Sequence, residues 1–341
     1  MPRHICSFGC ASFPFRAFTT FDVRYGIYSL RYVPAVILNS IEQHLLHERI
    51  IMQISFHTDA FNSVFWTFEK CVQWAAANDV HYIESGIMDG VSWAHGLGYW
   101  PHVATFEDPV SLRKFMEKHN VQYSQIDAAF PLSGGLGPTI GVPYVQRSIQ
   151  WAKLVGCPRI ATTDGLTAAK GYADEQAMEL MKWCYGEIIE LAEKNEITIT
   201  IEIHGYYTTK PDFLARMLEF CDSPYFGLNL DTGNTYIAGQ DPVEFARRFG
   251  DKVKHMHIKD VTEQLSADNR GEDTGIAISH SAIGDGVNAN NIKESLKIVH
   301  EAGFNGPISM EVEGNGGPTI EKSLRWLRAT LAELGIPEEK G

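Results

Sequence analysis

From residue 52 onward, short apolar runs alternate with longer runs whose apolar residues recur at helical spacing. Short runs rich in β-branched and aromatic residues predict buried strands, and apolar residues that recur on one helical face predict amphipathic helices. The predicted strands cover residues 53–57, 82–86, 122–128, 159–165, 199–204, 226–232, 254–260 and 307–313. The predicted helices include residues 64–79, 144–156, 175–195, 211–221, 290–303 and 319–335.

This alternation predicts an α/β fold, a TIM (β/α)8 barrel, over residues 52–337. Strands that alternate with helices form parallel sheets, and the length suits a barrel of roughly 250 residues with insertions. An open, doubly wound sheet is the competing architecture, but the sequence has neither a GxGxxG motif after the first strand nor a P-loop.

Residues 1–51 have no clear period, and two interpretations of them stay open. They are either an extension upstream of a true start at Met52 or a genuine N-terminal arm. If they are an extension, a chain that begins at Met52 should fold and remain active, because the barrel pattern is complete without them.

Two long segments, 86–107 and 261–287, follow strands on the side where such barrels build their active sites. The first contains Trp93, His95 and His102, which are suited to binding a sugar ring; an apolar patch for dimer packing is the alternative. The second contains Arg270 and His280, which we also expect to contact the substrate.

Composition and charge narrow the class of protein. The net charge is −13 with no basic run, so we expect no nucleic acid partner. The six cysteines form no CxxC pair, which is typical of reduced thiols in a cytoplasmic protein. No segment reaches the roughly 18 apolar residues that a membrane span needs, so we expect no membrane association.

Metal-capable side chains end four predicted strands in the second half of the chain. These are Glu202 and His204, then Asp231, then His255 and His257, then Glu311 and Glu313. A single such carboxylate could simply cap the next helix or pair with a lysine, but four strand ends in register favour a divalent metal site, since isolated buried carboxylates are costly. Three carboxylates and one imidazole suit Mn²⁺ best, with Mg²⁺, Co²⁺ or Zn²⁺ possible.

The segments IEIHG, LDTGN, KHMHIKD and SMEVEG, in this order and spacing, resemble the metal-ligand strands of the xylose-isomerase-like barrel superfamily. It contains ketose 3-epimerases, inosose dehydratase and isomerase, and endonuclease-IV-type repair enzymes. The resemblance covers residues 52–337 and implies four metal ligands: Glu202, Asp231, His257 and Glu311. It places His255 deeper in the barrel, as a hydrogen-bonded residue that orients another ligand.

The chain departs from the ketose 3-epimerases at Asn234, where they commonly carry a histidine, and in the segment that holds Arg270 and His280. We expect His204 and Asn234 to contact the substrate. The repair-enzyme branch would need a basic face, which the net charge of −13 disfavours.

The resemblance implies a metal-dependent isomerase or epimerase that removes a proton next to the carbonyl of a keto-sugar, through an enediolate, with Glu202 and Glu311 as the catalytic carboxylates. The alternative is a lyase that acts by β-elimination on a 3-keto-glycoside or inosose, such as a C-glycoside deglycosidase subunit or inosose dehydratase. The lyase is favoured somewhat by the presence of His95, His102 and His280, because a departing group needs an acid that protonates it. A sugar-binding barrel without catalysis is a third, less favoured interpretation.

We expect a small-molecule sugar or keto-glycoside substrate and no organic cofactor. A homo-oligomer is expected, or a hetero-oligomer if the chain is a deglycosidase subunit.

Overall fold

The computed structural model describes residues 51–90, 103–271, 274–314 and 316–339. The two interpretations of residues 1–50 lie outside this part of the chain, as do the roles expected of Trp93, His95 and His102.

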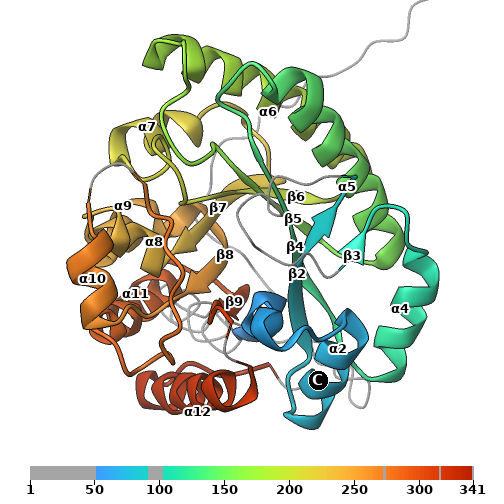
Figure 1. Cartoon of the computed structure of the whole chain (residues 1–341), viewed down its shortest axis with the longest axis vertical. Helices are drawn as coiled ribbons and strands as arrows, with labels where there is room; N and C mark the ends of the chain where they lie inside the picture. Colours follow the sequence, from blue (N-terminus) through green and yellow to red (C-terminus); the bar gives the residue numbers. More distant parts are fainter. Residues whose placement is uncertain (1–50, 91–102, 272–273, 315, 340–341) are drawn as a thin grey trace, which may run out of the picture. The chain divides into compact units, whose positions relative to one another are not determined.

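Parallel strands close into a barrel, as the alternating pattern predicts. The strands are β1 (Gln53–Phe56), β2 (Tyr82–Met88), β3 (Val103–Ala104), β4 (Gln122–Pro131), β5 (Arg159–Thr163), β6 (Thr198–Glu202), β7 (Phe226–Asp231), β8 (Val253–Ile258) and β9 (Pro307–Met310). Their order is β1-β9-β8-β7-β6-β5-β4-β2-β3, and Figure 1 shows the strands arranged as a ring. A parallel bridge between His57, directly after β1, and Glu84 on β2 closes this ring. The predicted barrel is confirmed.

One strand was missing from the prediction. Among the described residues, strand β3 pairs with β2 alone, through Ile87↔Val103 and Met88↔Ala104, and therefore stands outside the ring. It lies inside the segment 86–107 that was expected to be a loop, and β2 extends to Met88. Two residues are too few to carry a readable alternation, so no pattern in the sequence indicates this strand.

Helices surround the sheet (Figure 1). They are α2 (Phe68–Ala77), α4 (Pro109–Lys118), α5 (Val142–Val155), α6 (Asp174–Asn195), α7 (Pro211–Met217), α8 (Thr232–Ile237), α9 (Pro242–Phe249), α10 (Glu263–Asn269), α11 (Ala289–Glu301) and α12 (Gly317–Leu334), with short helical turns η1 (Thr58–Val64), η2 (Gly137–Gly141) and η3 (Gly250–Lys252). Within the described chain, none of these helices is long and apolar enough to cross a membrane.

Helix boundaries correct the prediction in two places. The helix expected at 64–79 begins only at Phe68, because Thr67 is its N-cap and accepts a hydrogen bond from the Lys70 amide. The helix expected at 211–221 ends at Met217. Helices α4, α8, α9 and α10 lie between strands, in segments for which no helix bounds were predicted.

Each barrel strand is buried on both faces, yet its side chains differ between them. On β8, Met256 and Ile258 belong to the apolar core, while His255 and His257 make polar contacts inside the barrel. Strand β6 repeats this alternation with Ile201 in the core and Glu202 inside the barrel. Barrel interiors are usually filled by branched apolar residues. Here the interior is polar toward the carboxyl ends of the strands.

At the opposite end of the barrel, the C-terminal segment contacts the amino ends of β1 and β2. Glu338 bridges to Met52, and the carboxylate of Glu339 accepts hydrogen bonds from Tyr82 Oη at 2.6 Å and Gln53 Nε2 at 2.7 Å. The polar groups at the amino ends of β1 and β2 are thus satisfied by the protein itself.

Candidate metal centre

Four side chains from consecutive strands meet at the carboxyl end of the barrel. Glu202 ends β6, Asp231 ends β7, His257 lies near the end of β8, and Glu311 directly follows β9. One ligand atom from each lies within 4.8 Å of the others, and all four residues are buried. His257 Nδ1 lies 3.3 Å from Glu202 Oε1 and 3.7 Å from one oxygen each of Asp231 and Glu311. The structure thus brings together the four residues that the sequence predicted as metal ligands, and their binding of a metal stays a prediction.

Several atoms of this group have no hydrogen-bond partner among the described residues: Asp231 Oδ2, His257 Nδ1 and Glu311 Oε2. A buried polar atom without a partner costs roughly 1–3 kcal/mol, and a buried charge costs more. The atoms point toward one another, so a single cation could satisfy all of them. Three oxygen donors and one nitrogen donor fit a divalent metal ion.

Asp231 combines two roles expected of a carboxylate at a strand end, namely helix cap and candidate metal ligand. Its Oδ1 caps helix α8 by accepting from the amides of Gly233 and Asn234, at 2.7 and 2.8 Å. Its Oδ2 is the oxygen left without a partner in the described chain. The cap fixes the carboxylate so that its second oxygen faces the group.

The charges around His257 match a site built for a cation. Burial alone would lower the pKa of His257, but the charges of Glu84 and Glu202 hold it well above its usual value. Burial, followed by the opposing charge of Lys259 and the reinforcing charge of Asp231, leaves the pKa of Glu311 well above its usual value. Metal binding to groups of this kind is coupled to the release of protons.

The other residues expected at the site are distributed unevenly. Asn234 is buried, and its Nδ2 lies 3.4 Å from Glu202 Oε1, so it adjoins the group. His204 follows β6 and its Nδ1 lies 3.0 Å from Thr163 Oγ1. His280 is exposed, with its Nδ1 2.5 Å from the Glu313 carbonyl. With residues such as Thr262 and Lys322 it lines a hollow of about 410 Å³.

Arg270 has an evident role that differs from the expected one. Its guanidinium donates to the carbonyls of Tyr236 and Gly239, each at 3.1 Å, and stacks over the Tyr236 ring. These contacts tie the segment 261–287 to helix α8. A substrate contact by Arg270 stays a prediction.

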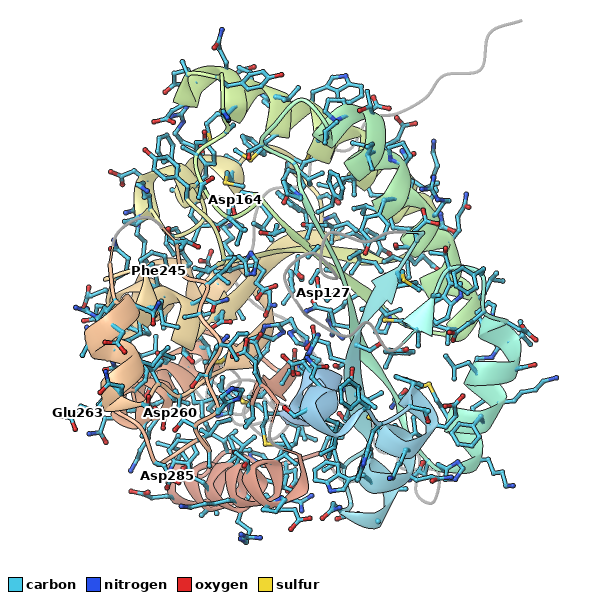
Figure 2. All side chains as sticks on the ribbon, viewed as in Figure 1. Asp127, Asp164, Phe245, Asp260, Glu263 and Asp285 are labelled. Carbon is cyan, nitrogen blue, oxygen red and sulfur yellow. The ribbon has the colours of Figure 1, made fainter. Side chains whose placement is uncertain are left out.

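Sequence reasoning missed two polar residues near the group, one directly after β1 and one on β4. His57 follows β1, with its ring 6.2 Å from the His257 ring and its Nδ1 3.0 Å from Asp59 Oδ1. Asp127 lies on β4 toward the middle of the barrel (Figure 2), and burial together with the charge of Glu202 raises its pKa to about 7. The signal was present, since both residues are polar positions within apolar strands.

A buried lysine, Lys259, lies next to Glu311 and Glu313. Lys259 Nζ lies 3.0 Å from Glu313 Oε1 and 3.7 Å from Glu311 Oε2. Asp59, Glu311 and Glu313 place oxygens within 4.8 Å of one another. The ammonium group offsets part of this negative charge.

Two further buried aspartates serve the loops (Figure 2). Asp164 accepts from the amides of Gly205 and Tyr207 and from Thr208 Oγ1, which holds the turn after β6. Asp260 accepts from the amides of Gly284, Gly286 and Asn288 in the same way. These carboxylates are satisfied internally, in contrast to Asp231 and Glu311.

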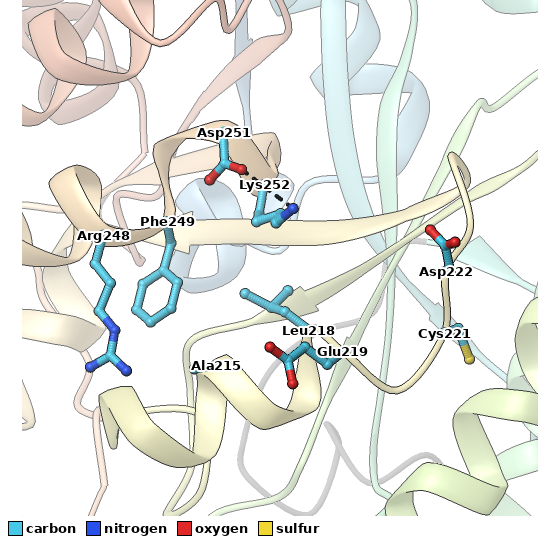
Figure 3. A pocket seen from close by; sticks show the side chains of 9 residues that line it. All are labelled: Ala215, Leu218, Glu219, Cys221, Asp222, Arg248, Phe249, Asp251 and Lys252. Carbon is cyan, nitrogen blue, oxygen red and sulfur yellow. Dashed lines mark ion pairs between the residues drawn. The ribbon is translucent and has the colours of Figure 1, made fainter.

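The hollow in Figure 3 lies elsewhere. It has a volume of about 550 Å³ and is lined by Ala215, Leu218, Glu219, Cys221, Asp222, Arg248, Phe249, Asp251 and Lys252. These residues precede β7 and β8, so the hollow opens at the amino ends of the strands. It contains none of the four converging residues.

A family model described as "Xylose isomerase-like TIM barrel" matches residues 72–330. The chain belongs to this family. Among curated proteins, an inosose dehydratase of Lacticaseibacillus casei is 28% identical over 154 residues, which are 42% of this chain and 51% of that protein. The chain spans about half the length of the curated relatives it matches.

Solved structures support the same fold. A D-tagatose 3-epimerase-like protein is similar with a TM-score of 0.66 and 17% identity, over 83% of this chain and 98% of that one. A structure titled as the IOLI protein with a binding zinc atom is similar with a TM-score of 0.65 and 16% identity, over the same shares. At these identities the likeness establishes the barrel.

Proposed function

We propose that this protein is a divalent-metal-dependent enzyme that removes a proton next to the carbonyl of a keto-sugar or a related cyclic polyol ketone. The observation that carries the proposal is the convergence of four buried side chains with three unpartnered donor atoms at the active end of the barrel. The family match and the relatives named as inosose dehydratase and D-tagatose 3-epimerase-like protein support the same class of chemistry.

Glu202, Asp231, His257 and Glu311 would hold the metal. Mn²⁺ is the proposed ion, because three of the four donors are hard oxygens. When bound, the metal stabilises the negative charge that develops on the substrate oxygens as the proton leaves.

The protein's own residues handle the protons. Glu202 and Glu311 stand on β6 and after β9, with β7 and β8 between them. A substrate carbon between the two carboxylates can lose a proton to one and regain a proton from the other on the opposite face. This is epimerisation, the reaction we propose first.

Dehydration is the second candidate, and a specific contact favours it. In that reaction the proton leaves one carbon, the neighbouring carbon–oxygen bond breaks, and the departing hydroxyl takes up a proton to leave as water. Lys259 lies 3.7 Å from Glu311, so a cationic donor stands next to one of the proposed carboxylates. Relatives named as inosose dehydratases point the same way.

One experiment separates the candidates. The purified protein with Mn²⁺ is incubated in D₂O with ketoses, inososes and 3-keto-glycosides, and the products are followed by NMR. Deuterium exchange with an inverted centre supports the epimerase, whereas an unsaturated product or a released group supports the lyase. EDTA should abolish turnover and Mn²⁺ should restore it. Full turnover by protein shown to be metal-free by elemental analysis would contradict both.

A further inference from the structure

A second layer of polar side chains lies inside the barrel beneath the four converging residues. It consists of Glu84 on β2, Gln125 on β4, Thr200 on β6, Asn229 on β7 and His255 on β8, each fully buried. Burying so many polar groups is costly unless they bond to one another. The layer therefore needs a reason beyond packing.

Its hydrogen bonds converge on Glu84. Gln125 Nε2 donates to Glu84 Oε1 at 2.8 Å, and Thr200 Oγ1 donates to Gln125 Oε1 at 2.7 Å. His255 Nδ1 lies 3.1 Å from Asn229 Oδ1 and 3.2 Å from Gln125 Nε2. One oxygen of Glu84 is thus held from within the layer, and the other, Oε2, lies 2.9 Å from His257 Nε2.

The two nitrogens of His257 consequently face different environments. Nε2 meets the carboxylate of Glu84, while Nδ1 faces Glu202, Asp231 and Glu311. An ionised carboxylate only accepts hydrogen bonds, so Nε2 must carry a hydrogen and donate it. Asn229 Nδ2 also lies 3.2 Å from Nε2, but the shorter, charge-assisted bond to Glu84 is the stronger one.

We infer that Glu84 is a positioning residue that keeps the hydrogen of His257 on Nε2 and so leaves the Nδ1 lone pair for the metal. The inference rests on the proposed metal site. A carboxylate behind a ligating imidazole fixes the tautomer and ring orientation and makes the imidazole a better donor. The hydrogen bonds of the polar layer beneath hold Glu84 in the position that this role requires.

A second metal ion between Glu84, His255 and His257 is the competing interpretation, since their donor atoms also lie within 4.8 Å of one another and His255 Nε2 has no hydrogen-bond partner in the described chain. The 2.9 Å between Glu84 Oε2 and His257 Nε2 is a hydrogen-bond length. The geometry therefore favours the hydrogen bond.

The first test removes the charge of Glu84 and keeps the shape of its side chain. Metal-stripped Glu84→Gln should bind Mn²⁺ or Co²⁺ roughly 10- to 100-fold more weakly than the unchanged protein by calorimetry, and its Co²⁺ visible spectrum should differ. The matched control is Glu339→Gln at the opposite end of the barrel; it should lower the melting temperature, because it weakens the contacts to Tyr82 and Gln53, but leave the metal affinity unchanged. Equal metal affinity in Glu84→Gln and the unchanged protein would overturn the inference.

The second test needs no variant of Glu84. In the Zn²⁺-loaded protein, ¹⁵N NMR of the His257 ring should show a hydrogen on Nε2, and elemental analysis should find one metal ion per chain. A hydrogen on Nδ1, or two ions per chain, would overturn the inference. Failure of the proposed function looks different, because there Asp231→Ala and the unchanged protein would bind metal alike, or metal-loaded protein would turn over no member of the substrate panel.

Discussion

At the amino end of the barrel, both oxygens of Glu339 are occupied by donors from Tyr82 and Gln53. At the carboxyl end, Asp231 and Glu311 each keep one buried oxygen without a hydrogen-bond partner in the described chain. Internally satisfied polar groups contribute stability, whereas converging unsatisfied ones mark a place for a ligand.

The largest expected effect concerns the two proposed catalytic carboxylates. Glu202→Gln and Glu311→Gln should each keep the fold, because the amide is nearly isosteric, while turnover falls by more than the ~10²- to 10⁴-fold typical of losing one general base. Steady-state kinetics and circular dichroism measure both properties. Near-normal rates in both variants with metal bound would rule out the two-carboxylate mechanism and turn attention to His95, His102 and His280.

The second prediction tests whether the carboxyl end of the barrel binds a cation. At a free Mn²⁺ concentration of about 100 times Kd, the free energy of unfolding should rise by about 2.7 kcal/mol. Thermal or urea unfolding with and without EDTA measures this difference. Asp231→Ala should abolish the Mn²⁺-dependent rise. This rise is compared between the proteins in place of the absolute free energy of unfolding, because the variant also loses the cap of helix α8. A full rise in Asp231→Ala would place the ion elsewhere.

A substitution at the amino end of the barrel should change the stability of the protein and leave its turnover unchanged. Glu339→Ala removes the acceptor of the buried Tyr82 hydroxyl, which should cost roughly 1–3 kcal/mol in the free energy of unfolding. Turnover of the folded variant should not change, because Glu339 lies at the opposite end of the strands from the metal centre. Urea unfolding and kinetics below the transition measure the two quantities. A selective loss of turnover would mean that the two ends are coupled.

The smallest effect concerns Arg270, where the structure offers an anchoring role in place of the expected one. Arg270→Ala should lower the free energy of unfolding by less than about 1 kcal/mol, since it removes only exposed contacts to helix α8. KM should stay within about twofold, a difference well below 1 kcal/mol. A several-fold increase in KM would instead support the substrate contact that the sequence suggested.

Much of the barrel could be predicted because its strands are short apolar runs separated by amphipathic helices. The metal-capable ends of β6 to β9 were equally readable, since four polar interruptions recur at one position of successive strands. Glu84 was overlooked, although it too is an acidic residue in an apolar strand. The register of β2 against β4 shifts between Ile83 and Glu84, and a sequence pattern does not show which face follows such a shift.

By itself the sequence determined that these strands form and that carboxylates and a histidine end several of them, because alternation and turn signals are local properties. Only the tertiary structure decided how each polar group is used. Asp231 caps a helix with one oxygen and places the other near Glu202, His257 and Glu311, whereas both oxygens of Asp164 accept hydrogen bonds from the loop after β6. The pairing of Glu84 with His257 spans the barrel from β2 to β8, and such a contact depends on closure of the sheet.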